Sequence, residues 1–215
     1  MHGLGAPSAW VQRFTPLLKP ASRVLDLACG GGRHVQWLAG LGHQVTGVDR
    51  DAAALARVRQ AVPAAELLHA DVEAGPWPLA GRQFDAIVVT HYLWRPLFPA
   101  LLDALADGGI YLHETFADGQ QHIGRPSRPD FLLQRGELLQ VCAGLRVVAF
   151  EDGFEPGPGG GAEGARFVQR IMAVNESAAA GLQNRWLLGM PSAVTPGATP
   201  GTTPDVTPGM TSPAG

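Results

Sequence analysis

Apolar, β-branched runs alternate along this chain with segments of helical periodicity. The apolar runs predict strands at 23–29, 44–49, 66–70, 84–90, 110–116, 145–151 and 166–175. Apolar residues at helical spacing predict helices at 33–41, 97–106 and 137–143, and Asp51 is placed to cap an alanine-rich helix that follows it. This alternation predicts an α/β fold, a Rossmann-like doubly wound sheet of about seven strands that is mostly parallel.

The last strand is expected to run antiparallel. The segment 153–164, between the sixth and seventh strands, is rich in glycine and proline. Such a short connection cannot hold the crossover helix that two parallel strands need, so the last two strands should form an antiparallel hairpin.

The pattern divides the chain into three parts. Residues 1–20 are expected to form a helical segment, 21–176 the α/β domain, and 177–215 a short helix followed by a tail. From Val194 the tail repeats the tetrapeptides VTPG, ATPG, TTPD and VTPG. A proline every fourth residue and few large apolar side chains predict disorder there.

Composition narrows the class of protein. Of 215 residues 46% are hydrophobic, and the net charge of −3 gives no general attraction to nucleic acid or anionic membranes. Only two cysteines are present, too few for a disulfide framework. Because neither a leader pattern nor an apolar run of about 20 residues is found, we expect a cytoplasmic protein with no membrane or nucleic-acid partner.

The segment VLDLACGGG, residues 24–32, carries the first chemical signal. A strand that leads through a glycine-rich turn into a helix lets the backbone approach a ligand closely. A dinucleotide fingerprint would continue G-x-G-x-x-G, but Val35 stands where its third glycine belongs. Asp26 is an unfavourable neighbour for a pyrophosphate and suits a ligand with an ammonium group, such as the amino-acid part of S-adenosylmethionine.

Two more acids follow successive strands. Asp49 ends the second strand, where a carboxylate can accept hydrogen bonds from both ribose hydroxyls. Asp71 follows the third strand, where it can accept from an adenine amine while the Val72 N–H meets a ring nitrogen. A single acid at a strand end is usually a plain loop residue. Three of them on successive strands favour an adenosine ligand at the carboxyl edge.

The motifs DLACGGG, VDRD, HADVE, FDAIVVT and GGIYLHETF, in this order, resemble those of class I S-adenosylmethionine-dependent methyltransferases. The run RPSRPDFLLQRGELL, with the HETF before it, resembles small bacterial tellurite-resistance methyltransferases. The resemblance implies S-adenosylmethionine as the cofactor. It places Asp26, Gly30 and Gly32 at the methionine part, Asp49 at the ribose, Asp71 and Val72 at the adenine, and His91 beside the methionine and the sulfur.

The acceptor side is less legible. His91, Tyr92 and Glu114 are candidate catalytic residues, since each follows or ends a strand at the same edge, but packing or solvation explains each of them as well. Trp94, Arg125 and Arg128 are candidates for substrate contact. The insertion 117–135 is expected to cover the crevice, with Pro126, Pro129 and Phe131 sealing it and the two arginines facing a polar or anionic acceptor.

The sequence thus predicts methyl transfer from S-adenosylmethionine to a small-molecule acceptor. A soft sulfur or chalcogen nucleophile is slightly favoured, because no clear general base is present. Two alternatives stay open: a non-catalytic S-adenosylmethionine-binding regulatory module, and an NAD(P)-dependent oxidoreductase. The histidines and cysteines show no metal-ligand spacing, so no metal is expected. The oligomeric state is left open.

Overall fold

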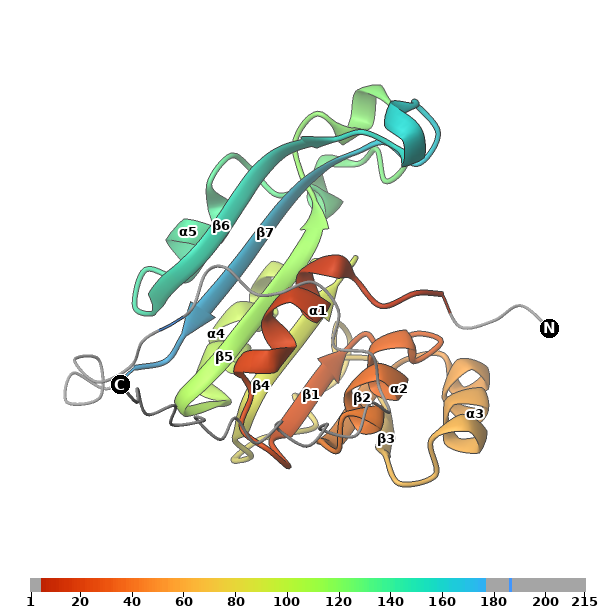
Figure 1. Ribbon diagram of the computed structural model, residues 1–215, viewed down its shortest axis with the longest axis vertical. Helices are drawn as coiled ribbons and strands as arrows, with labels where there is room; N and C mark the ends of the chain where they lie inside the picture. The colour runs from red at the N-terminus through yellow and green to blue at the C-terminus, as the bar shows by residue number, and fades with distance from the viewer. Residues whose placement is uncertain (1–4, 177–185, 187–215) are drawn as a thin grey trace, which may run out of the picture.

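A single seven-stranded sheet forms the centre of the molecule in the computed structural model, which describes residues 5–176 and Trp186 (Figure 1). The strands are β1 (Arg23–Leu27), β2 (Gln44–Asp49), β3 (Glu66–His69), β4 (Phe84–Thr90), β5 (Leu105–Phe116), β6 (Arg146–Glu155) and β7 (Arg166–Val174). They lie in the order β3-β2-β1-β4-β5-β7-β6. Strands β1 to β5 pair in parallel, whereas β7 pairs antiparallel with both β5 and β6. The expected hairpin and doubly wound sheet are confirmed.

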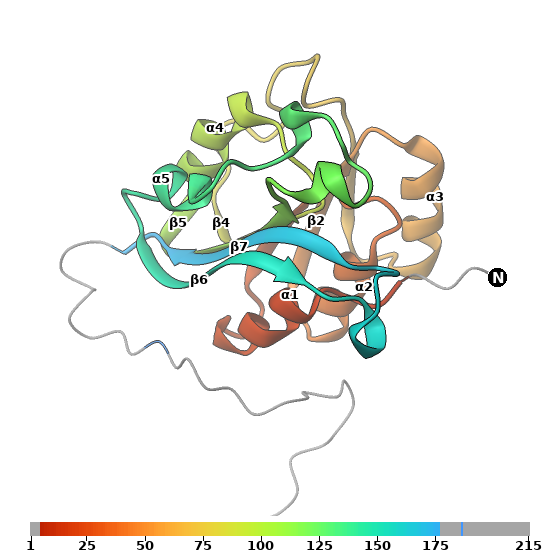
Figure 2. The same cartoon turned by 90° about the horizontal axis from the view of Figure 1, so that it is seen from above.

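Helices cover both faces of the sheet. They are α1 (Ala9–Phe14), α2 (Arg33–Gly40), α3 (Ala52–Ala61), α4 (Phe98–Asp103) and α5 (Glu137–Val141). Viewed from above, α4 and α5 lie on one side of β6 and β7, and α1 and α2 lie on the other (Figure 2). Asp51 caps α3 as predicted, because its side chain accepts from the Ala53 and Ala54 N–H groups.

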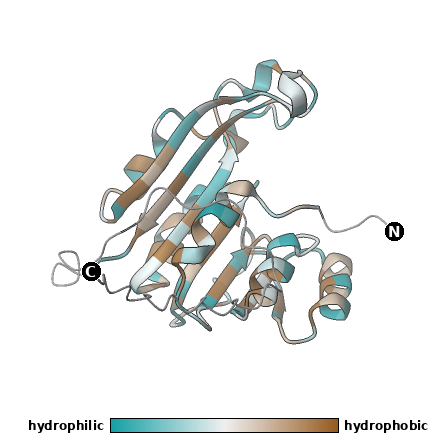
Figure 3. Cartoon of the chain, viewed as in Figure 1, coloured by the Kyte–Doolittle hydropathy of each residue, from teal (hydrophilic) through white to brown (hydrophobic). Residues whose placement is uncertain are grey.

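The strand residues alternate between two cores. Leu25 and Leu27 pack with Ile87 on the α4 and α5 face, while Val24 packs with Val35 on the α1 and α2 face. This burial on both faces explains the nearly continuous hydrophobic runs of the inner strands (Figure 3). The alternation also sends neighbouring side chains at the ends of the strands to opposite sides of the sheet.

Several of the predicted boundaries are wrong. The helix expected at 97–106 ends at Asp103, and β5 begins at Leu105 rather than Ile110. The reason is pairing: the Phe84 N–H donates to the Ala104 carbonyl, and Gly108 and Gly109 exchange backbone hydrogen bonds with Asn175. Strand β6 runs on to Glu155 because it stays paired with β7 along its whole length. The expected short helix and disordered tail of 177–215 lie outside the described residues, apart from Trp186.

The loop between β1 and α2 depends on residues with positive φ. Ala28, Gly30 and Gly32 have φ values of 52°, 51° and 78°. A Cβ on Gly30 would meet open space, but one on Gly32 would lie 2.6 Å from Cγ2 of Val58 in α3. Gly32 is therefore required for the close packing of the start of α2 on α3.

Replacing Gly32 tests this packing. We expect Gly32→Ala to lower the free energy of unfolding by about 2–4 kcal/mol, the sum of left-handed backbone strain and overlap with Val58. Gly42→Ala is the control, because Gly42 also has positive φ (85°) but no atom would lie within 4 Å of its Cβ. Urea unfolding of both variants measures the difference. Equal losses would show that the contact with Val58 contributes nothing.

Candidate functional site

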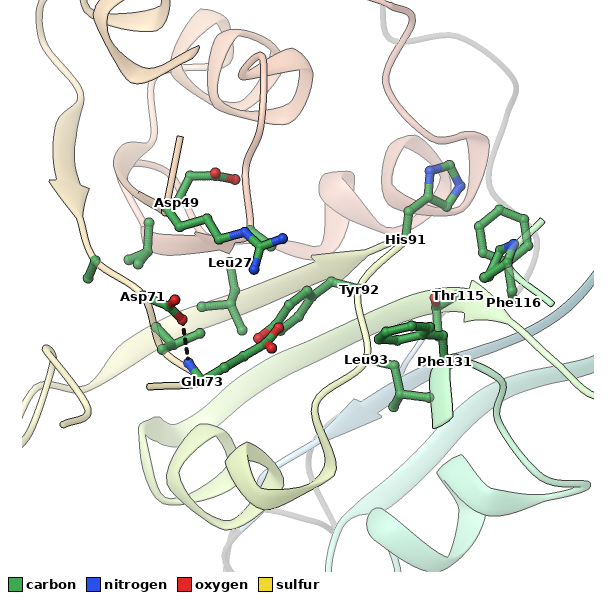
Figure 4. A pocket seen from close by; sticks show the side chains of 16 residues that line it. Leu27, Asp49, Asp71, Glu73, His91, Tyr92, Leu93, Thr115, Phe116 and Phe131 are labelled. Atoms are coloured by element: carbon green, nitrogen blue, oxygen red, sulfur yellow. Dashed lines mark hydrogen bonds between the residues drawn. The ribbon is translucent and has the colours of Figure 1, made fainter. Parts of the chain in front are cut away.

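A cavity of about 360 Å³ opens at the carboxyl ends of the parallel strands. Every strand from β1 to β5, or the loop after it, contributes to its wall, and the insertion after β5 contributes too. The lining residues are Leu27, Ala28, Val48, Asp49, Arg50, Ala70, Asp71, Val72, Glu73, His91, Tyr92, Leu93, Thr115, Phe116, Pro126 and Phe131. Figure 4 shows the acidic side chains at one end, the aromatic ones at the other, and Tyr92 between them.

The acidic end is held in place by backbone hydrogen bonds. One carboxylate oxygen of Asp49 accepts from the Gly30 N–H at 2.7 Å and the other from the Asp51 N–H at 2.8 Å. The Asp71 carboxylate accepts from the Glu73 N–H at 2.9 Å. The same Asp71 oxygen also accepts from the Ala74 N–H at 3.3 Å, which leaves the other Asp71 oxygen free. Both acids are therefore oriented and can still accept from a ligand.

The Tyr92 hydroxyl is buried and has no hydrogen-bond partner among the described residues. Burial and the negative charge of Glu73 raise the pKa of this phenol, so it keeps its proton at neutral pH. The Tyr92 ring separates the acidic end from the aromatic end (Figure 4). A buried donor without a partner is costly, and a ligand in the cavity would relieve that cost.

His91 follows β4 with a positive φ of 54°. Its ring stacks on Phe116, with ring centroids 5.2 Å apart, and its Nε2 lies 3.0 Å from an Nη of Arg166, which donates to it. Burial, together with the positive charges of Arg33 and Arg166, lowers the pKa of His91 to about 4. His91 is therefore neutral at physiological pH and is a weak base, with one nitrogen already occupied.

Asp26 lies near the end of β1 but does not line the cavity. It is 1% exposed, and neither carboxylate oxygen has a hydrogen-bond partner among the described residues. His34 has its Nδ1 3.9 Å from the carboxylate, and the positive charge of Arg33 partly offsets the effect of burial on the pKa of Asp26. Burial lowers the pKa of His34 to about 3, and its Nε2 accepts from the Ser8 N–H, so it is neutral. Burial likewise raises the pKa of Asp26 to about 7.

Glu114 is 2% exposed and does not line the cavity. Its carboxylate forms an ion pair with Arg170 at 2.9 Å, lies 3.5 Å from Arg166, and accepts a hydrogen bond from the Ser8 hydroxyl at 3.1 Å. With these partners it joins β5, β7 and the N-terminal segment. The structure thus gives Glu114 a structural position, away from any reacting atom in the cavity.

The remaining candidates also lie outside the lining, which contains neither Gly30, Gly32, Trp94, Arg125 nor Arg128. Trp94 packs against the hydrophobic core. Arg128 is 71% exposed and pairs with Asp130 at 2.9 Å, and Arg125 is exposed. Of the predicted site residues, the cavity brings together Asp49, Asp71, Val72, His91 and Tyr92.

Sequence reasoning missed the residues that shape the aromatic end. Arg95, after β4, pairs with Glu137 at 2.7 Å and donates to the carbonyls of Asp130 and Leu132. These bonds fix the insertion, and with it Phe131, over the cavity. An arginine at the start of a 3₁₀ turn carries no sequence signal for such a role. Thr115 and Phe116 are the last two residues of β5, and their position at the carboxyl end of a strand could have indicated that they line the site.

Two searches of the described residues gave negative results. Within residues 5–176, together with Trp186, there is no cluster of three or more histidine, cysteine or acidic side chains suited to a metal ion. In the same part of the chain no helix has the length and apolar character needed to cross a membrane.

Comparisons with known proteins point to methyltransferases. Residues 24–109 match a family model described as a methyltransferase domain. The chain is 41% identical over 101 residues to trans-aconitate 2-methyltransferase of Paracidovorax citrulli (strain AAC00-1), covering 43% of this chain and 38% of that protein. The structure of TehB from Haemophilus influenzae superposes with a TM-score of 0.68 at 19% identity, covering 81% of this chain and 64% of that one.

The N-methyltransferase NodS from Bradyrhizobium japonicum WM9, in complex with S-adenosyl-L-homocysteine, also shares the fold, with a TM-score of 0.59 at 17% identity over 78% of this chain and 84% of that one. Residues 24–109 thus match a methyltransferase domain in sequence, and the described part of the chain shares its fold with solved methyltransferases such as NodS. The chain spans 38–65% of the length of four curated methyltransferases that it matches.

The contact between Arg166 and His91 can be tested by titration. We expect Arg166→Gln to raise the pKa of His91 from about 4, because a neighbouring positive charge is removed. The value should remain below 6.5, since burial, the largest cause of the shift, is retained. NMR of the His91 ring proton against pH measures it. Arg13→Gln, on the exposed pair with Glu151, is the control, and an unchanged His91 titration in Arg166→Gln would refute the contact.

Asp26 should make stability depend on pH. Its pKa is about 7 in the folded chain, against an ordinary value of 3.8 for an exposed aspartate, so the folded state binds more protons between these values and loses stability as pH rises. We expect Asp26→Asn to remove this loss. The free energy of unfolding of the variant, relative to that of the parent, should therefore increase from pH 4 to pH 8. Urea unfolding of the ligand-free proteins measures the gain. Asp103→Asn is the control, and a constant difference between Asp26→Asn and the parent would contradict the assignment.

Proposed function

We propose that this chain binds S-adenosylmethionine in the cavity and transfers its methyl group to a small-molecule acceptor. The observation that carries the proposal is the convergence of Asp49, Asp71 with Val72, and His91 on one cavity at the carboxyl edge. In doubly wound sheets this crevice is where ligands bind. An NAD(P)-dependent oxidoreductase has no support from the matched family, and no specific observation favours a non-catalytic module.

The acidic end of the cavity suits adenosine. Asp49 is the residue we assign to the ribose hydroxyls, because its carboxylate lines the cavity at the end of β2 and is oriented by two N–H groups. Asp71 and Val72 are assigned to the adenine amine and a ring nitrogen. Arg50, also in the lining, is available to lie against the adenine face.

The methionine part needs a partner for its ammonium group. Asp26 supplies a buried carboxylate without hydrogen bonds, beside the glycine-rich loop. A cation near this carboxylate would lower its raised pKa and offset the cost of its burial. We therefore assign Asp26 to the methionine end together with Gly30, although reaching Asp26 requires the loop to adjust.

The bound cofactor supplies an electrophilic methyl group on a sulfonium, so the chain's task is to align the acceptor and exclude water. His91 is neutral, and its Nε2 accepts a hydrogen bond from Arg166. The Glu114 carboxylate already forms an ion pair with Arg170. Neither is therefore set up to remove a proton at neutral pH. This supports an acceptor that needs little base catalysis, such as a soft sulfur or chalcogen nucleophile.

A substitution at Asp49 tests the cofactor site. We expect Asp49→Asn to weaken S-adenosylmethionine binding about 10–100-fold, the effect of losing a charged acceptor worth about 1.5–3 kcal/mol. Isothermal titration calorimetry with S-adenosylmethionine, S-adenosylhomocysteine and NAD measures it, and NAD should not bind to the parent protein.

The control is Asp85→Asn, since Asp85 pairs with Arg23 near the amino end of the sheet, away from the cavity. This variant should bind the cofactor like the parent. Parent-like binding by Asp49→Asn would show that the ribose assignment is wrong. Binding of NAD without S-adenosylmethionine would overturn the proposed function itself.

A further inference from the structure

The end of the cavity beyond Tyr92 has no formally charged lining at neutral pH. Its lining residues are His91, Leu93, Thr115, Phe116, Pro126 and Phe131. If the acidic end holds adenosine and the methionine part extends past His91 toward Asp26 and Gly30, the rest of this end is the space left for the acceptor. Its composition therefore bears on the chemical class of the acceptor.

His91 belongs to this uncharged surface. Its lowered pKa of about 4 leaves the ring neutral, and stacking on Phe116 turns the ring into part of an aromatic wall. Phe131 forms the facing wall, and Arg95 holds the segment that carries it by bonds to Glu137, Asp130 and Leu132. The apolar end is thus a built surface rather than a chance gathering of side chains.

The arginines near the aromatic end already form ion pairs with carboxylates of the protein. Arg166 pairs with Glu155 at 2.6 Å and lies 3.5 Å from Glu114, so its charge is balanced before any acceptor arrives. Arg128 lies over the Phe131 ring, 5.2 Å from its centroid, but its charge is paired with Asp130 at 2.9 Å. Arg50 does line the cavity, and it directly follows Asp49, the last residue of β2. A carboxylate placed beside Phe116 and Phe131 would lose its hydration, and it would find only cations that already pair with a carboxylate of the protein.

We propose that the acceptor is an uncharged, largely apolar small molecule, and that the site rejects acceptors carrying a carboxylate. This inference rests on the proposed function. In the reaction a lone pair on the acceptor atom forms the new bond to the methyl carbon. The carbon–sulfur bond breaks with its electron pair going to sulfur, which gives S-adenosylhomocysteine. A thiol acceptor loses its proton to water.

Two benzylic thiols of equal size test this selectivity. The probes are 4-(mercaptomethyl)benzamide and 4-(mercaptomethyl)benzoate, whose thiols keep their protons at neutral pH, so that they differ chiefly in the charge of the para group. We expect kcat/KM for the amide to exceed that for the carboxylate by about 100-fold or more, because burial of an unpaired carboxylate is strongly unfavourable. Methylated product is measured with labelled cofactor. Binding of each probe to the protein loaded with S-adenosylhomocysteine is measured by calorimetry.

A charge-introducing pair of variants makes the test specific. Phe131→Arg should bring the two probes to within about 10-fold of each other by supplying the missing cation. Ile123→Arg is the control, since Ile123 is an exposed residue of the same insertion that does not line the cavity, and it should keep the parent's preference. Phe131 is 42% exposed, so the substitution is not expected to disturb folding.

The possible failures can be told apart. Suppose first that S-adenosylmethionine binds to the parent. The inference is then overturned if the parent methylates or binds the two probes equally well, or if the amide does not bind. A loss of preference in Ile123→Arg equal to that in Phe131→Arg would show that the aromatic end does not set the selectivity. Absence of S-adenosylmethionine binding would instead refute the proposed function.

Discussion

The carboxylate of Asp49 joins the ends of two strands, and the site is arranged around that connection. Its bond to the Gly30 N–H fixes the glycine-rich loop after β1, and its bond to the Asp51 N–H fixes the turn into α3. Gly32 then lets α2 approach Val58 of α3 more closely than any side chain would allow. The same loop therefore controls both the packing of two helices and the shape of the cavity.

Much of the fold was predictable because local pattern and tertiary burial agree. The inner strands are buried on both faces, so their apolar runs are unambiguous, and Gln44–Asp49 and Phe84–Thr90 match the prediction residue for residue. The start of β5 was missed because its sequence, with Gly108 and Gly109, is typical of a turn. Pairing with Phe84 and Asn175, which are distant in sequence, decides its structure.

The candidate site, like the fold, has a part that could be predicted from local sequence and a part that depends on long-range contacts. Acids at strand ends could be placed from sequence, since topology alone brings Asp49 and Asp71 to one edge. The contacts that hold the insertion over the cavity could not be predicted, because they are long-range bonds of Arg95 to Glu137 and Asp130. Sequence analysis expected Pro126, Pro129 and Phe131 to seal the crevice and Arg125 and Arg128 to face the acceptor. Pro126 and Phe131 do line the cavity, whereas Pro129 and the two arginines do not. Arginines near a site indicate its charge only when their carboxylate partners are known.

The position of β7 has a consequence for how the chain assembles. Strand β7 is last among the strands in sequence but lies between β5 and β6, so β6 has no neighbour in the sheet until β7 is in place. During synthesis from the N-terminus, β6 leaves the ribosome with its backbone groups unpaired. Completion of the sheet then depends on one hairpin docking along β5, a non-local event of the kind that slows folding and exposes strand edges to aggregation.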